Sequence, residues 1–333
     1  MVRVKAALVA LALFAFVLFT APVLILARRA PRKRTRTPGT SPVGSHFFQN
    51  GTSATVARLG SEDDRVWLLI QLITRCDPLM PRADARPTRA RVAQLLATVD
   101  ERSDYRNLAR ISGRQIRWLL FGELDPHHYY SYRPSPREPG ERFGLLMFLH
   151  GHGLNVLFMI EALRPLCDRM RLCLVTPSFG YGNWEAPGGV EAIDRATRFG
   201  LATPDVDPSR VYLGGYSQGG AGVSRGGAAL PNRFAGLIYI SPTMEPNVIG
   251  SPEFAAGWRG RPVLVIQGGR DYNVRPHTVD AAIEQMEAAG VRVTQHRAPD
   301  AGHFLFFAQL ETVTDRIGKW MAESLRTGRA PDS

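Results

Sequence analysis

The chain has 333 residues, of which 44% are hydrophobic and 21% are charged, so it is long enough for one large domain with an added segment and is not an intrinsically disordered protein. Its net charge is +11, and residues 1–36 alone contain eight basic residues and no acidic one. The rest of the chain has 33 basic and 30 acidic residues and no basic stripe with interleaved aromatic residues, which argues against binding to nucleic acid.

Residues 6–27 form an uncharged apolar stretch with basic residues on both sides. A helix of this length, rising 1.5 Å per residue, spans a hydrocarbon core about 30 Å thick. The apolar region of a secretory signal peptide is usually shorter, about 7–15 residues. We therefore predict an uncleaved N-terminal transmembrane anchor over residues 1–27 and a single-pass membrane protein. The count of basic residues on the two flanks favours a cytoplasmic location for the rest of the chain, but N-terminal single anchors often run the other way, so the side of the membrane stays undecided.

Two segments follow the predicted anchor. Residues 28–60 are rich in Arg, Pro, Gly, Ser and Thr, which is typical of a linker. Residues 61–121 contain three stretches of apolar residues at helical spacing, which begin near Ser61, Thr88 and Tyr105. This pattern predicts a small helical extension.

From residue 122 to residue 327 the pattern changes to alternating strands and helices, which is typical of an α/β domain with a mostly parallel central sheet flanked by helices. Apolar runs predict strands at residues 129–133 (as an edge strand), 144–149, 171–175, 211–213, 237–240, 263–266 and 291–295. Helical patterns cover residues 190–200, 277–289 and 313–325. The interval between the strands at 237–240 and 263–266 is too short for a large helical lid.

The pentapeptide GYSQG, residues 215–219, matches the pattern G-x-S-x-G. By composition alone such a match arises in roughly one chain in ten of this length. The context is more specific, because the pentapeptide follows a short apolar strand and opens a run of small residues. A nucleophilic serine on a sharp strand-to-helix turn needs such small neighbours, so we predict that Ser217 is the nucleophile.

The sequence LHGHG, residues 149–153, follows a predicted buried strand upstream of Ser217. In serine hydrolases this loop supplies one backbone N–H of the oxyanion hole, and the residue after the nucleophile supplies the other. These donors would be the N–H groups of His152 and Gln218, which would stabilise a developing alkoxide. The alternative is a metal site, because His-x-His is a ligand spacing. No further cluster of ligands follows, so we predict no metal.

Two loops that follow predicted strands carry an acid and a base. Asp271 ends the segment QGGRD, where a carboxylate can orient an imidazole, although Asp after Gly-Gly is also a common turn residue. His303 ends the segment DAGH and is the only one of the eight histidines in the loop after the last predicted strand, since His296 lies directly beside that strand. It completes the chain order Ser, Asp, His. Asp300 is the alternative acid.

In these motifs the sequence resembles the α/β-hydrolase superfamily. GYSQGG, LHGHG, QGGRD and DAGH are similar to its nucleophile, oxyanion, acid and base motifs, in the family's order. The segment VDPSRVYLGGYSQGG resembles bacterial esterases and polyhydroxyalkanoate-depolymerase-like enzymes, and also the catalytic domain of prolyl-oligopeptidase-like peptidases. The resemblance covers about residues 127–327 and implies an α/β-hydrolase fold. One departure is the glycine-rich helix after Ser217, since each interior glycine costs a helix about 1 kcal/mol relative to alanine.

The motifs predict a serine hydrolase that cleaves small carboxylic esters through an acyl-enzyme, with Ser217, Asp271 and His303 as its catalytic triad. This chemistry needs no cofactor and no metal. One alternative is a prolyl-oligopeptidase-like serine peptidase, although the sequence has no N-terminal β-propeller. The other is a catalytically silent binding module tethered to the membrane.

Residues 177–189 form a loop at the carboxyl end of a predicted strand, where ligand sites of α/β proteins form. Tyr181 and Trp184 lie in this loop. We predict that they line a pocket for an acyl or aryl group, with packing in the core as the alternative role for both rings.

Overall fold

The computed structural model describes residues 43–47, 70–71, 73–75, 80–102, 128–152 and 157–327. The predicted anchor, residues 1–27, lies outside these residues. Among the helices that the structure does describe, none has the length and apolar character needed to cross a membrane.

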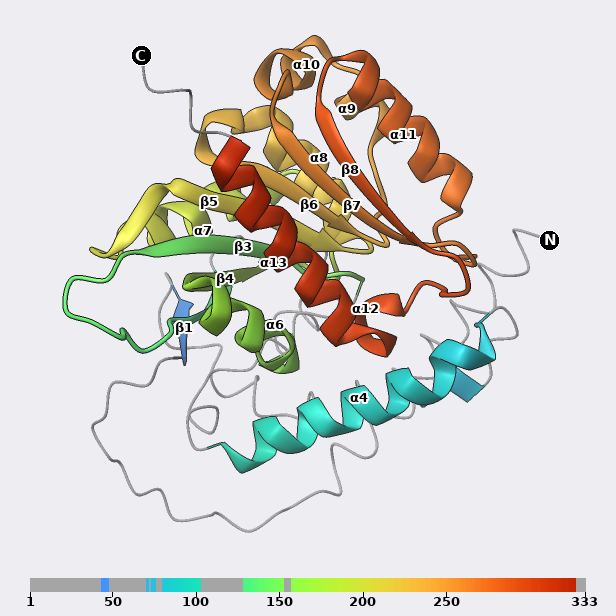
Figure 1. The fold of residues 1–333 in the computed structure, drawn as a ribbon, viewed down its shortest axis with the longest axis horizontal. Coiled ribbons are helices and arrows are strands. Elements are labelled where there is room, and N and C mark those ends of the chain that lie inside the picture. Colours follow the sequence, from blue (N-terminus) through green and yellow to red (C-terminus); the bar gives the residue numbers. More distant parts are fainter. Residues whose placement is uncertain are drawn as a thin grey trace.

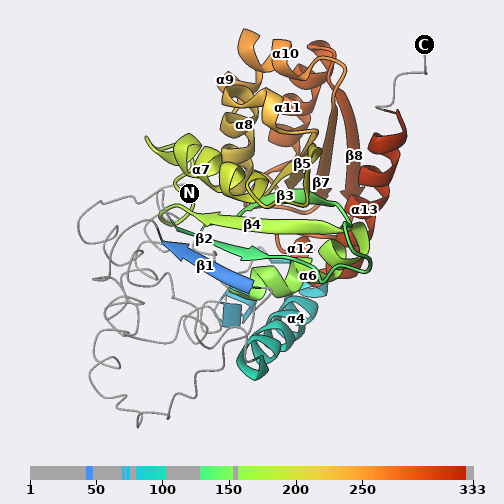
Figure 2. The same cartoon turned by 90° about the vertical axis from the view of Figure 1, so that its left-hand side faces the viewer.

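The core of the molecule is one eight-stranded sheet with helices on both faces (Figures 1 and 2). In chain order its strands are β1 (Val43–Phe47), β2 (His128–Tyr132), β3 (Phe143–Leu149), β4 (Leu172–Ser178), β5 (Val206–Tyr216), β6 (Gly236–Ile240), β7 (Pro262–Gly268) and β8 (Arg292–Ala298). Their order in the sheet is β1-β2-β4-β3-β5-β6-β7-β8. Neighbouring strands from β4 to β8 pair in parallel, whereas β2 is antiparallel to both β1 and β4. The predicted mostly parallel sheet is therefore confirmed.

The central strands are apolar because helices cover both of their faces. Every residue of β3 and β4 is buried, as expected for parallel strands between two helical layers. Side chains alternate between the two faces along a strand. In β3, Leu146 and Phe148 join one core cluster, whereas Leu145, Met147 and Leu149 join the other.

One layer of helices is formed by α4 (Arg82–Glu101), α6 (Leu157–Met170), α12 (Leu305–Ala308) and α13 (Leu310–Thr327). The other is formed by α7 (Gly189–Leu201), α8 (Gly219–Ala229), α9 (Pro246–Ile249), α10 (Pro252–Trp258) and α11 (Pro276–Ala288). Figure 2 shows the two layers on opposite sides of the twisted sheet.

The sheet has an edge that the sequence pattern did not predict. Residues 129–133 were expected as an edge strand, but β1 pairs with the observed strand β2, from Val43 opposite Tyr132 to Phe47 opposite His128. Strand β1 comes from within residues 28–60, which were expected to be linker. The linker prediction is therefore wrong for residues 43–47, because a five-residue strand in a polar segment leaves no local periodicity to detect.

Helix α4 is the part of the predicted extension that the structure describes most fully. It begins at Arg82, before the predicted start near Thr88, and continues through Pro87. Its first turn is polar and carries no apolar pattern, which explains the late predicted start. The helix packs against α6 and α12 (Figure 1), with its apolar side chains in the core. The segment expected to begin near Tyr105 lies outside the described residues.

Candidate active site

Ser217 lies on the turn between β5 and α8 with a φ of 53°, a left-handed conformation that is uncommon for residues other than glycine. Its backbone is held from three sides. The Ser217 N–H donates to Ile240 O at 3.0 Å, and the Ser217 carbonyl accepts from the N–H groups of Gly220 at 2.9 Å and Thr243 at 2.8 Å. These three hydrogen bonds stabilise a left-handed backbone conformation that is otherwise unfavourable for serine.

The glycines after Ser217 allow α8 to pack directly on the end of β3. A Cβ atom on Gly219 would lie 2.2 Å from the carbonyl oxygen of Leu149. A Cβ atom on Gly222 would lie 2.6 Å from Leu149 Cδ1 and 2.9 Å from Trp184 Cγ. Close packing therefore accounts for the glycines that depart from good helix-forming composition, and α8 is continuous from Gly219 to Ala229.

The structure brings Ser217, His303 and Asp271 into one chain of hydrogen bonds. His303 Nε2 lies 2.9 Å from Ser217 Oγ, and His303 Nδ1 lies 2.9 Å from Asp271 Oδ2. The histidine and the aspartate stand on the loops that follow β8 and β7, at the carboxyl edge of the sheet. The Asp271 side chain is 0% exposed and that of His303 is 10% exposed, so the hydrogen bond between them is shielded from water.

The hydrogen bonds of Asp271 determine the tautomer of the imidazole. Asp271 Oδ1 accepts the N–H groups of Asn273 at 3.0 Å and Val274 at 2.8 Å, and Oδ2 accepts the side-chain amide of Gln267 at 3.2 Å. A carboxylate is only an acceptor, so His303 Nδ1 must carry the proton. His303 Nε2 is then free of hydrogen and can accept the hydroxyl proton of Ser217.

Asp300, the alternative acid, does not occupy this position. Its side chain is 79% exposed and forms an ion pair with Arg270 at 2.9 Å. The residue is close to His303 in sequence, but its carboxylate is turned to solvent.

The loop expected to supply an oxyanion donor lies against the serine. A Cβ atom on Gly151 would be 3.0 Å from Ser217 Cβ. Within the part of the chain that the structure describes, the backbone N–H groups of His152 and Gln218 donate to no backbone carbonyl. Gln218 is also the residue that precedes α8, whose amino end favours negative charge.

His150 supports this loop from inside the protein. Its Nε2 accepts the backbone N–H of Phe179 at 3.3 Å, so its Nδ1 is the donor to Gly151 O at 2.7 Å. Burial lowers the pKa of His150 to about 4. Both ring nitrogens are engaged, so the metal-ligand alternative for the pair of histidines is not supported by this geometry.

The neutral state of His150 predicts an acid-sensitive fold. Unfolded, the imidazole has a pKa near 6.5, so the unfolded chain binds a proton before the folded chain, whose His150 has a pKa of about 4. The free energy of unfolding should therefore fall as the pH decreases from about 6.5 to 4, by up to roughly 3 kcal/mol from this residue. Urea unfolding at pH 7 and at pH 4.5 measures the change. His150→Gln should flatten it, and an equal pH dependence in both chains would contradict the explanation.

The two aromatic residues of the loop after β4 differ in their surroundings. Trp184 is 0% exposed, and its indole N–H donates to His150 O at 3.0 Å. The prediction that Trp184 lines a pocket is wrong, because its ring fills the space that Gly222 leaves against α8. Tyr181 is partly exposed, and its ring lies 6.0 Å from that of His152. It remains a predicted substrate-lining residue.

Tyr216 is a contributor that the sequence analysis did not single out. It is buried beside the nucleophile, and its hydroxyl donates to the backbone carbonyl of His303 at 3.2 Å. Burial, followed by the charges of Asp271 and Asp84, raises the pKa of Tyr216 well above its usual value, so the hydroxyl keeps its proton and remains a donor. In the sequence Tyr216 occupies the first variable position of G-x-S-x-G, where the motif does not specify a residue type.

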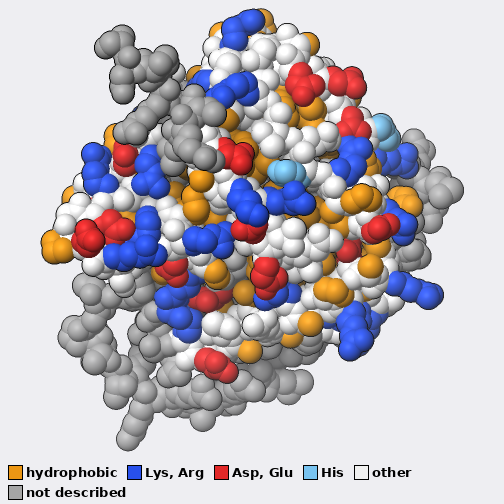
Figure 3. Space-filling view, viewed as in Figure 1, with side chains coloured by type: hydrophobic (Ala, Val, Ile, Leu, Met, Phe, Trp, Pro, Cys, Tyr) orange, Lys and Arg blue, Asp and Glu red, His pale blue; other side chains and the backbone are white. Residues whose placement is uncertain are grey.

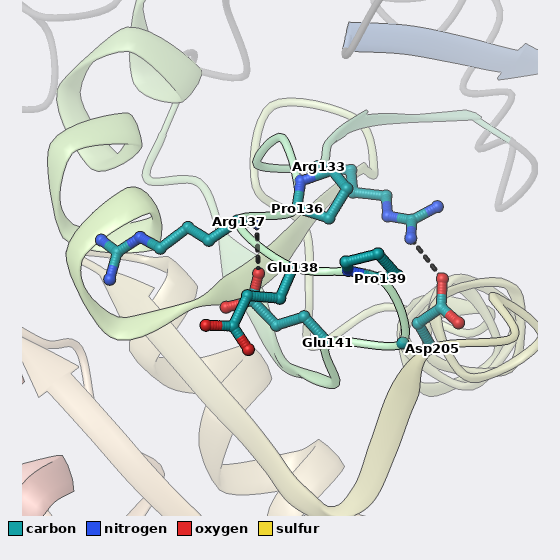
Figure 4. Close-up of a pocket in the computed structure, with 8 residues that line it drawn as sticks. Arg133, Pro136, Arg137, Glu138, Pro139, Glu141 and Asp205 are labelled. Atoms are coloured by element: carbon teal, nitrogen blue, oxygen red, sulfur yellow. Dashed lines mark hydrogen bonds and ion pairs between the residues drawn. The ribbon is translucent and has the colours of Figure 1, made fainter.

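A surface hollow lies away from these residues (Figure 4). It is lined by Arg133, residues 136–141 and Asp205, at the end of the sheet where β3 and β5 begin. Arg133 pairs with Asp205, and Glu141 accepts the backbone N–H of Arg137 at 2.7 Å. Because Ser217 follows the opposite end of β5, this hollow is not part of the candidate site.

No family model matches the sequence. Among solved structures, the fold is similar to that of a fungal esterase from Rhizomucor miehei, with a TM-score of 0.50, 15% sequence identity, and coverage of 71% of this chain and 97% of the other. Est1E from Butyrivibrio proteoclasticus gives a TM-score of 0.49 at 18% identity, with coverage of 60% and 95%. The S-formylglutathione hydrolase FrmB from Staphylococcus aureus gives 0.47 at 15% identity, with coverage of 58% and 89%. At such identities the similarity concerns the fold alone.

Proposed function

We propose that this chain, which has an α/β-hydrolase-like fold, is a serine hydrolase that cleaves carboxylic esters. The observation that supports the proposal is the continuous hydrogen-bond chain from Asp271 through His303 to Ser217, with both links at 2.9 Å. A nucleophile, a base and an orienting acid in this geometry are the parts that acyl transfer through a covalent intermediate requires.

The reaction would proceed in two acyl transfers. Ser217 Oγ attacks the ester carbonyl while its proton passes to His303 Nε2, and Asp271 stabilises the imidazolium. The N–H groups of His152 and Gln218 bind the oxyanion of the tetrahedral intermediate. His303 then returns the proton to the leaving alcohol, which leaves an acyl group on Ser217. Water attacks this ester by the same steps and releases the acid.

A fluorophosphonate probe tests the proposal directly, because the probe phosphonylates an activated serine without requiring the natural substrate. We expect a single adduct on Ser217 by mass spectrometry, together with hydrolysis of p-nitrophenyl esters. Cleavage of peptide anilides in preference to esters would favour the peptidase alternative. A chain that takes no label and hydrolyses neither substrate would fit the silent binding module.

The partners that we propose are a small ester substrate and, through residues 6–27, a membrane. Basic and acidic side chains are interspersed over the described part of the face seen in Figure 3. A face of mixed charge does not present the one-sign field that attracts a phosphate backbone.

The anchor predicts how the protein partitions between cell fractions. The full-length chain should stay in the membrane fraction through high-salt and carbonate washes, and a chain that begins near residue 37 should be soluble. The basic residues 28–36 attract anionic lipid by roughly 1 kcal/mol per charge, and salt screens this attraction. Burial of the apolar residues 6–27 is not weakened by salt. Immunoblots of the washed fractions measure the outcome.

Two results would change this proposal. Release by salt alone would reduce the segment to a peripheral attachment held by its charges. A mature N-terminus mapped beyond residue 27 would make the segment a cleaved signal peptide.

A further inference from the structure

The first turn of α4 touches the loop that carries His303. Asp84 is buried, and its carboxylate Oδ2 accepts the backbone N–H of Gly302, the residue directly before His303. The two partners are 218 positions apart in the sequence. A helix from the N-terminal extension therefore contacts the backbone next to the imidazole that faces Ser217.

The contact is close as well as polar. A Cβ atom on Gly302 would lie 2.7 Å from Pro81 Cδ and 3.0 Å from Asp84 Oδ2. Pro81 and Asp84 form the amino end of α4, so this end of the helix is in van der Waals contact with the loop. Any displacement of α4 at this end would move Gly302 or break its hydrogen bond.

The loop that carries His303 also accepts hydrogen bonds from residues next to Asp271 and next to Ser217. The N–H of Arg270 donates to Ala301 O at 2.8 Å, and the N–H of Gly269 donates to Ala298 O at 2.8 Å. The Tyr216 hydroxyl donates to His303 O at 3.2 Å. These bonds fix one side of the loop, and Asp84 holds the N–H of Gly302 from α4.

Helix α4 is itself firmly placed. Val92, Leu95 and Val99 are buried in the core cluster that also contains residues of α6 and α12. Arg91 pairs with Glu311 of α13. The carboxylate of Asp84 is therefore presented by a packed element rather than by a mobile side chain on the surface.

The chemistry of Asp84 fits a role as a fixed acceptor. The pKa of Asp84 is raised, chiefly by burial and also by the charge of Asp271, although the hydrogen bond from Gly302 acts to lower it. A carboxylate accepts a peptide N–H more strongly than a neutral oxygen does. Burial of a second carboxylate near Asp271 is unfavourable by itself, and the hydrogen bond from Gly302 offsets part of this cost.

We propose that Asp84 is a positioning residue for His303, which makes α4 a part of the active site. By holding the Gly302 N–H, its carboxylate sets the place of the imidazole between Ser217 and Asp271. The inference rests on the proposed hydrolase function. Asp84 lies behind the loop and does not touch the reacting atoms, so its effect is transmitted through the backbone of Gly302.

The test compares Asp84→Ala and Asp84→Asn in the full-length chain, purified in detergent, with p-nitrophenyl acetate as substrate. A misplacement of about 1 Å can lower the rate by about 100-fold. We expect Asp84→Ala to lower kcat by about 10- to 100-fold with KM changed by less than about twofold, because substrate binding is not affected. The kcat of Asp84→Asn should be at least about fivefold higher than that of Asp84→Ala, since the amide oxygen of asparagine can still accept the Gly302 N–H.

Val92→Ala is the matched control, because it removes core packing further along the same helix and keeps Pro81 and Asp84 at the amino end that contacts Gly302. It should lower the thermal unfolding midpoint and leave kcat unchanged. The proposal is overturned if Val92→Ala lowers kcat as much as Asp84→Ala does, or if Asp84→Asn is as slow as Asp84→Ala. Either result would mean that the hydrogen bond to Gly302 does not place the imidazole.

An NMR measurement without substrate tests the positioning role of Asp84 independently of the hydrolase function. The NMR signal of the His303 Nδ1 proton, in chain labelled with 15N-histidine, reports the hydrogen bond to Asp271. Asp84→Ala should shift or broaden this signal, and Val92→Ala should leave it in place. If the wild-type chain hydrolyses no ester and takes no fluorophosphonate, the proposed function fails. An unchanged signal in Asp84→Ala would instead overturn the positioning role.

Discussion

Replacement of Ser217 with alanine should abolish ester hydrolysis and fluorophosphonate labelling while the chain keeps its fold. The change removes the one atom that attacks the carbonyl and accepts the acyl group. Members of a triad act as a unit, so the loss in kcat should be on the order of 10⁶-fold. The fold should persist because the backbone hydrogen bonds of Ser217 to Ile240, Gly220 and Thr243 do not involve the hydroxyl. Ester kinetics and circular dichroism measure the two effects.

Ser241 provides a matched control for this experiment. It also follows a parallel strand with a left-handed backbone, at a φ of 41°, and it is buried. Its hydroxyl has no hydrogen-bond partner among the described residues. Ser241→Ala should therefore keep the activity and the labelling of the wild-type chain. If Ser217→Ala keeps more than a small fraction of wild-type activity, the nucleophile lies elsewhere.

The parts of the fold that the sequence predicts are those with a local pattern. The strands at residues 144–149, 237–240 and 263–266 are continuous apolar runs, because parallel strands are buried on both faces. β1 has no such pattern, and its pairing with β2 depends on a segment far along the chain. Helix α13 was likewise predicted because its apolar residues recur at regular helical spacing. The first turn of α4 was missed because it is polar.

The candidate site divides in a similar way. Ser217, Asp271 and His303 each stand in a short motif after a strand, so their residue types and order can be read without coordinates, and the structure places the three side chains together. Asp84 lies in no motif, and its contact with Gly302 joins positions 218 residues apart. The burial of Trp184 depends on the glycines of α8, whose packing against it only the three-dimensional structure reveals.

Asp271→Asn should lower kcat by about 10³- to 10⁴-fold, whereas Asp300→Asn should change it by less than about twofold. In the folded chain Asp271 Oδ1 accepts two backbone N–H groups, and Oδ2 faces His303 Nδ1. An asparagine keeps its oxygen toward the backbone donors, which turns its NH₂ group toward the imidazole. His303 Nδ1 must then become an acceptor and the ring proton moves to Nε2, where it blocks the transfer from Ser217.

The side chain of Asp300 is 79% exposed and pairs with Arg270, so its replacement leaves this proton arrangement unchanged. Initial rates with a p-nitrophenyl ester at saturating concentration give the ranking of the two variants. A second measurement separates the loss of the correct tautomer from general damage. In a chain that already carries His303→Ala, Asp271→Asn should have little further effect, because the carboxylate acts through the imidazole. A large additional loss in that background, or the reverse ranking of the two single variants, would overturn the role of Asp271 as the orienting acid.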